Sequence, residues 1–328
     1  MRVLHRFARL FAGGTLGPAF NSDGDPLIGG QAVMEGVMMR TPQSYCVAVR
    51  KPNGEITTKE ETATRLSQRS RFWALPLLRG CGILGQSMTL GVKALNFSAS
   101  QAVESEETDD GAKSDELSGW VLGLNIAVSV GFFIVMYKLV PLLATNQLQE
   151  WVPALDNQVG FSFAEGGIRI AIFLSFLLAL SQMKDIRRVF EYHGAEHKVV
   201  YNYESGQDLT IENAQRFTTL HPRCGTSFLM VVMLVAIAVY ALVPFEGFVG
   251  PFIARVALLP LIAGISFEII RYTAKRQRGV FMLMARPGLW LQRVTTKQPD
   301  DSQVEVAIHA LKTAFDFERR AGGNPVVA

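Results

Sequence analysis

Two histidines four residues apart, His193 and His197, have the residue types and spacing best suited to chemistry in this chain. They stand in the string His193-Gly194-Ala195-Glu196-His197, which fits the pattern H-x-x-E-H. On a helix, positions i and i+4 share a face, so both imidazoles can bind one ion. In zincins with this inverted motif, the two histidines bind zinc and the glutamate acts on water. The motif therefore predicts a divalent metal site, with zinc as the expected ion.

Further groups that bind zinc follow on the C-terminal side of the motif. The connector 184–223 joins two apolar segments, and His221 and Cys224 lie at its far end. Consecutive antiparallel helices are usually neighbours, so the two ends of the connector should meet. We therefore expect His221 and Cys224 to return to the two histidines of the motif. Glu204 and Glu212, within the connector, are alternative further ligands.

Three kinds of site remain open for these residues. Three protein ligands plus water are typical of a catalytic zinc, with Glu196 as general base and Arg223 holding an anionic group. This arrangement predicts a zinc-dependent hydrolase, whose substrate the sequence does not indicate. Four protein ligands, with His221 and Cys224 both bound, make a structural site of a scaffold, assembly factor or sensor. A hydrogen-bonded polar cap on a helix bundle needs no metal.

The composition indicates a membrane protein. Of 328 residues, 49% are hydrophobic and 19% are charged, whereas soluble proteins carry about 25% charge. The net charge of +3 is too small to indicate a nucleic-acid partner, so the lipid bilayer is the expected partner. Runs with few or no charges predict four transmembrane helices, at 117–137, 170–183, 224–245 and 251–270. The second reaches full length only if Arg169 snorkels to the interface.

The distribution of basic residues predicts the orientation in the membrane. Lysine and arginine are concentrated in 184–223 and 271–278 and are rare in 141–168 and 244–250. The positive-inside rule then places the basic segments and both termini in the cytoplasm. A fifth span at 72–97 would invert this arrangement, so that segment predicts an interfacial or re-entrant helix.

The remaining segments are expected to be soluble. Residues 1–26 predict a flexible basic tail, and 98–116 an acidic linker. The segment 27–71 predicts β structure, because Ser44 to Arg50 alternates apolar and polar residues before the turn signal Pro52-Asn53-Gly54. In this segment Glu35 and Arg40 are either functional or simply an ion pair.

The C-terminal segment, 273–328, predicts one amphipathic helix. Pro299 to Ser302 is a helix-start signal. Beyond it, one apolar stripe consists of Val304, Ala307, Ile308 and Leu311. The predicted fold class is therefore mainly α. It is a polytopic membrane protein with about four transmembrane helices in 117–272, an interfacial or re-entrant helix, and a small N-terminal β element.

Four motifs, in order along the chain, resemble the YqhQ-like family. They are GGQAVMEGVMMR at 29–40, EYHGAEHK at 191–198, LHPRCGTSFL at 220–229 and PGLWLQRVTT at 287–296. The family consists of bacterial membrane proteins, with relatives in plastids, described as predicted metal-dependent enzymes. The resemblance implies a bacterial inner-membrane location but no substrate. It also implies metal-binding residues at five positions, namely His193, Glu196, His197, His221 and Cys224.

Overall fold

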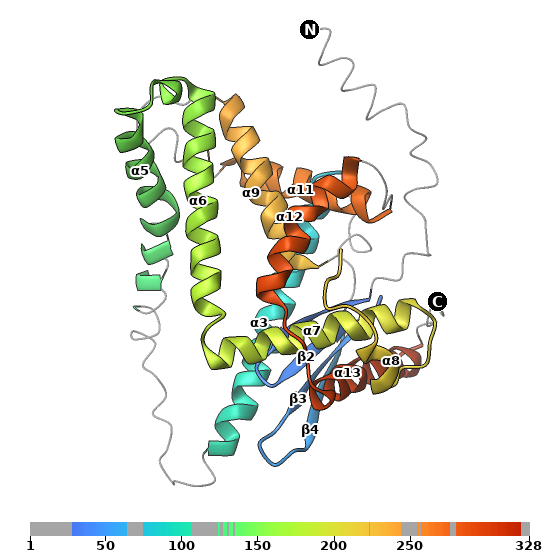
Figure 1. The fold of residues 1–328 in the computed structure, drawn as a ribbon. Coiled ribbons are helices and arrows are strands. Elements are labelled where there is room, and N and C mark those ends of the chain that lie inside the picture. The colour runs from blue at the N-terminus through green and yellow to red at the C-terminus, as the bar shows by residue number, and fades with distance from the viewer. Residues whose placement is uncertain are drawn as a thin grey trace.

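The computed structural model describes residues 28–63, 75–106, 135–222, 224–243, 257–275 and 280–322, with residue 255 and short pieces between 124 and 133. These residues are mainly helical, with one small sheet near the N-terminus. Most of the long helices stand together on one side, with the sheet and its covering helices beyond their ends, and the helix 78–106 continues alongside the sheet (Figure 1). The predictions for 1–26 and for most of the acidic linker fall outside the described residues.

The sheet is a four-stranded antiparallel meander in the order β1-β2-β3-β4. Its strands are β1 (Gly29–Val33), β2 (Gly36–Arg40), β3 (Ser44–Arg50) and β4 (Ile56–Thr62). The predicted β3–β4 hairpin is confirmed, and Gly54 adopts a φ of +87° in its turn. The β1–β2 hairpin was not predicted, and Glu35 in its turn has a φ of +52°.

Two helices pack on one face of the sheet to form a hydrophobic core. They are α7 (Lys184–Glu204) and α13 (Asp301–Arg320). Asp300 caps α13 through a capping box with Gln303, which confirms the predicted helix start. The whole predicted apolar stripe is buried, as shown by Val304, Ala307, Ile308 and Leu311. The N-terminal sheet, the connector and the C-terminal helix therefore form one body.

Three helices in the described residues are long and apolar enough to cross a membrane. They are Ala127–Gln149, α6 (Gln158–Leu180) and α9 (Gly225–Leu242). The first predicted span, 117–137, ends too early, because the helix continues through a π-helical turn, η3 (Val135–Leu139), into α5 (Val140–Gln149). A short helix, η4 (Pro153–Leu155), joins α5 to α6.

The second of these long apolar helices, α6, is longer than the predicted span 170–183. It contains both Glu165 and Arg169, which form an ion pair at 2.5 Å. Counting apolar residues missed the first half of the helix, because it took Arg169 for the end of the span. Arg169 pairs with Glu165 inside the helix bundle.

The other helices of this part are α3 (Leu78–Glu106), α11 (Leu259–Lys275) and α12 (Val280–Thr295). The helix α3 packs on α11, where Arg79 Nε donates to Glu268 at 2.6 Å. It runs beyond the expected boundary at residue 97 into the acidic stretch. The fourth predicted span, 251–270, overlaps α11, which begins later and is not among the three long apolar helices.

A sharp corner between α6 and α7 positions the histidine motif. The chain turns at residues 181–183, and α7 then lies across the ends of the long helices (Figure 1). A straight continuation would have carried His193 about 12 Å beyond Asp185, at 1.5 Å per residue. The corner keeps the motif beside the start of α9. The short helix α8 (Ile211–Gln215), capped by Thr210, completes the connector.

Candidate metal centre

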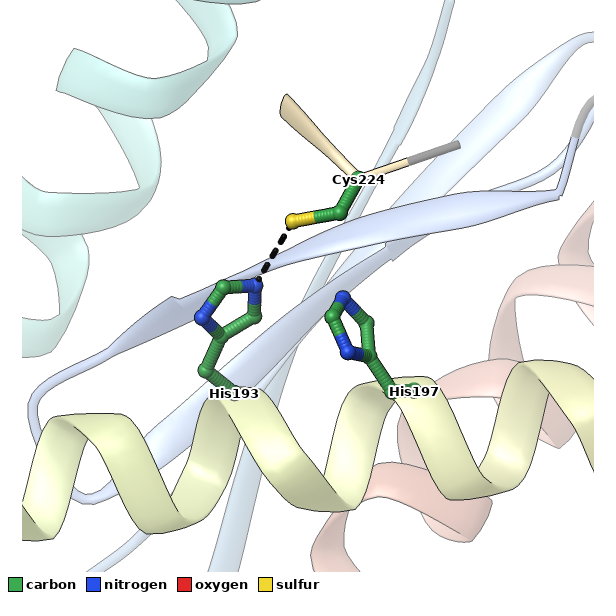
Figure 2. Close-up of side chains that lie close together, drawn as sticks. All are labelled: His193, His197 and Cys224. Atoms are coloured by element: carbon green, nitrogen blue, oxygen red, sulfur yellow. Dashed lines mark hydrogen bonds between the residues drawn. The ribbon is translucent and has the colours of Figure 1, made fainter. Parts of the chain in front are cut away.

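His193, His197 and Cys224 come together at the junction between α7 and α9. One nitrogen of each histidine and the cysteine sulfur all lie within 4.8 Å of one another. Both imidazoles rise from the same face of α7 toward Cys224, and His193 Nε2 is 3.2 Å from the Sγ atom (Figure 2). Cys224 is also the N-cap of α9, where its Sγ accepts from the backbone of Thr226. This donor set, two imidazoles and one thiol, is typical of zinc ligands.

Backbone carbonyls fix the orientation of both imidazoles. His193 Nδ1 lies 2.8 Å from the carbonyl oxygen of Thr295, and His197 Nδ1 lies 2.5 Å from that of Thr219. A carbonyl only accepts, so each Nδ1 carries the proton and each Nε2 presents its lone pair. His197 Nε2 is buried without a hydrogen-bond partner among the described residues. Such bonds to the remote nitrogen are the usual support of metal-binding histidines.

Glu196 lies at the edge of this group. One carboxylate oxygen is 3.6 Å from His197 Nε2 and 4.0 Å from His193 Nε2. The residue is only 6% exposed. Strand β1 covers it closely, because a Cβ built on Gly30 would lie 2.8 Å from its Cγ. The contact explains one of the glycines in the N-terminal motif, whose role the sequence did not reveal.

His221 lies next to the group but is not among its three close ligand atoms. Its Nε2 is 3.5 Å from a carboxylate oxygen of Glu204, and its ring centroid is 5.6 Å from that of His197. Burial lowers the pKa of His221, although the carboxylate of Glu196 opposes this effect. Gln292 of α12 holds its backbone, accepting from N–H at 2.7 Å and donating to the carbonyl at 2.8 Å.

A buried lysine, missed in the sequence, supports the connector. Lys198 is 2% exposed, and its ammonium donates to the carbonyls of Gln215 and Phe217 at 2.8 and 2.7 Å. Burial lowers the pKa of this lysine. The two bonds hold the chain just before Thr219, whose carbonyl orients His197. Lys198 therefore acts on the site through the backbone.

The other predicted site residues lie elsewhere. Glu212 is exposed and pairs with Arg216 on α8. Arg40 donates to Gln86 at 3.3 Å. Arg223 lies outside the described residues.

Glu35 ties the sheet to the start of α7. Its carboxylate accepts from Arg188 at 2.7 Å and lies 3.4 Å from the hydroxyl of Tyr192. Burial, together with the nearby carboxylate, raises the pKa of Tyr192. Through these contacts Glu35 positions α7. Its ion-pair partner is therefore Arg188 of that helix and not Arg40.

Gly194 provides a test of how tightly the site is packed. A Cβ at this position would lie 2.0 Å from the carbonyl oxygen of Lys297, in the segment that carries Thr295. Gly194→Ala must displace that segment, so we expect a loss of about 1–3 kcal/mol in unfolding free energy, typical of overpacking. Thermal unfolding of the variant and the wild type measures this loss of stability.

The matched control is Gly85→Ala in α3, where an added Cβ meets nothing within 4 Å. This change should leave stability equal or raise it by up to about 1 kcal/mol, because alanine favours helix. Equal stability of the Gly194 and Gly85 variants would contradict the close approach of α7 to residue 297.

Comparisons with known proteins agree on one family. The family model described as "Protein of unknown function (DUF1385)" matches residues 75–317. "Uncharacterized protein YqhQ" of Bacillus subtilis (strain 168) is 35% identical over 300 residues, which cover 89% of this chain and 93% of that protein. No solved structure shows a significant match.

Proposed function

The chain belongs to the DUF1385 family, whose description assigns no activity, and we propose from its geometry that it is a metal-dependent hydrolase at the cytoplasmic face of a membrane. The observation that carries the proposal is the group formed by His193, His197 and Cys224, with its ligand atoms within 4.8 Å. Both histidines are already oriented by carbonyls, as a preformed site requires.

Glu196 distinguishes a catalytic site from a purely structural one. Its carboxylate lies 3.6 and 4.0 Å from the two Nε2 atoms, close enough to contact a molecule held between them. The carboxylate would take a proton from water as general base. A bound zinc ion supplies Lewis acidity and lowers the pKa of water. His193, His197 and Cys224 would hold the ion, and the helix α7 would keep the carboxylate facing it.

The packing of the sheet and α13 against α7 supports the proposed topology. The sheet contacts α7, so both lie on one side of the membrane and an even number of crossings must separate them. The helices Ala127–Gln149 and α6 supply two crossings between the sheet and α7. A crossing by α3 would make the number odd, so α3 does not cross in this topology. The helix α13 also contacts α7, so α9 needs a returning crossing between residues 243 and 300. That segment contains α11, which supports a fourth crossing.

Reporter fusions test this topology. Fusions after residues 100, 155, 205 and 320 should read inside, outside, inside and inside. Of these four sites, only residue 155, at the α5–α6 junction, lies on the outer side of the membrane in this topology. Alkaline phosphatase and fluorescent-protein reporters provide the two signals. An outside reading at residue 100 would mean that α3 crosses, and the four-span arrangement would then be wrong.

His221 separates the hydrolase from the alternative scaffold with a closed, four-ligand zinc site. Its Nε2 lies 3.5 Å from Glu204, so we expect His221→Ala to keep its metal, with affinity changed by about tenfold or less, as for a supporting residue. Metal titration of the purified protein measures the affinity. In the closed site, His221→Ala would lose as much affinity as Cys224→Ala, and that result would favour the scaffold.

A further inference from the structure

A second polar cluster lies in α6, away from α7. Glu165 is 1% exposed, about 10 Å along the helix from its first residue, Gln158, and about 22 Å before Leu180, at 1.5 Å per residue. Since α6 is long and apolar enough to cross a membrane, this carboxylate lies within the depth of the span. Ionisable groups there are costly and usually functional.

Two arginines from different parts of the chain bind this carboxylate. Arg169 donates to Oε1 at 2.5 Å, and Arg255 donates to both oxygens at 3.1 and 3.0 Å. The π-helical turn η3 contributes as well, because Arg169 Nε donates to the carbonyl of Tyr137 at 3.0 Å. The guanidinium of Arg255 lies over the ring of Tyr240, 5.3 Å from its centroid. Two guanidinium groups thus converge on one carboxylate, and η3 and α9 each contact one of them.

The carboxylate of Glu165 cannot neutralise all the positive charge of the cluster or accept from all of its N–H donors. Arginine is always charged in proteins, so two guanidinium groups against Glu165 leave an excess of one positive charge among the described residues. In addition, Arg255 Nε is buried and donates to no described residue. Unpaired charges and unsatisfied donors are both costly at low dielectric. One more anionic oxygen would relieve both costs.

We propose that Glu165, Arg169 and Arg255 form a phosphate-binding site within the membrane-spanning part of the protein. The planar guanidinium group suits oxygen anions, and both arginines already hold one in Glu165. Their side chains are each 13% exposed, which leaves limited access. Glu165 is then a tethered competitor that sets the affinity. The phosphate is either free or carried by a lipid headgroup, and neither case depends on the metal site.

Two substitutions with opposite effects test the site. Glu165→Gln keeps a polar side chain but removes the competing charge, so phosphate should bind about tenfold more tightly, the weight of one charge-assisted hydrogen bond. Arg255→Gln removes the excess positive charge, so binding should weaken by at least about tenfold on the same basis. The control is Arg319→Gln, which removes a guanidinium 68% exposed on α13.

The probes are inorganic phosphate and phosphatidylglycerol. Purified full-length protein in phosphatidylcholine nanodiscs is titrated with phosphate at constant ionic strength, with thermal stabilisation as the readout. Native mass spectrometry in detergent counts bound phosphatidylglycerol. A response to phosphate alone assigns a soluble anion, and a response to the lipid assigns a headgroup, and either supports the site.

Other results overturn the proposal. No binding of either probe to the wild type, or equal binding by all variants, would make the cluster a structural ion pair. If Arg255→Gln fails to fold, Arg255→Lys keeps the charge without the planar fork and should weaken binding severalfold. The Glu165→Gln prediction stands independently of both.

Discussion

Replacing His193 and His197 together by alanine is expected to remove bound zinc from the protein. Two of the three close ligand atoms disappear, and a single cysteine cannot retain the ion. Zinc content should fall from about one ion per chain to less than about a tenth, since structural and catalytic sites need at least three protein ligands. Elemental analysis of the purified protein gives this number directly.

His309→Ala is the matched control for this loss. His309 is exposed on α13, far along the chain from the cluster, and should not change the zinc content. Cobalt provides a second readout, because a cysteine ligand gives an intense charge-transfer band that Cys224→Ser should abolish. Full zinc retention in the double alanine variant would show that the ion binds elsewhere.

Glu196→Gln is expected to abolish activity while leaving the metal in place. The amide keeps the shape of the side chain beneath Gly30 but cannot accept a proton. Removal of a general base typically lowers the rate by about 10²–10⁴-fold. Complementation of a strain lacking the gene measures the activity, and elemental analysis of the same variant measures the zinc. We expect the variant to fail in complementation and to keep an unchanged zinc content.

The control for this substitution is Glu212→Gln. It makes the same chemical change at an exposed carboxylate that pairs with Arg216, so it should complement fully. Full complementation by a zinc-replete Glu196→Gln protein would instead favour the scaffold function. Loss of zinc would identify Glu196 as a ligand, or as a residue that orients one.

The local part of the metal centre could be predicted from sequence, because helical periodicity alone places His193 and His197 on one face. The approach of Cys224 followed from the rule that consecutive spans are neighbours. The supporting groups could not be predicted in this way. The carbonyls of Thr219 and Thr295 have no sequence signature, and the contacts of Gly30 and Gln292 depend on packing between distant segments.

The helices showed a similar division between local and distant effects. The start of α13 was predicted because its capping signal is local. The extent of α6 was not, because apolar runs were ended at charged residues. Glu165 and Arg169 lie inside the helix and pair with each other, and Arg255, from a distant segment, binds the same carboxylate. Such a partner cannot be recognised from the segment itself.

Cys224 belongs to α9, whereas its two partner histidines belong to α7, which lies across the ends of the long helices (Figure 1). The 18 residues of α9 span about 27 Å, less than a hydrocarbon core of about 30 Å. A helix shorter than the hydrocarbon core is accommodated by local thinning of the bilayer and by shifts of the residues that flank its ends, and Cys224 is at such an end. A thicker bilayer would therefore shift the sulfur relative to the imidazoles, and zinc affinity should vary with lipid chain length.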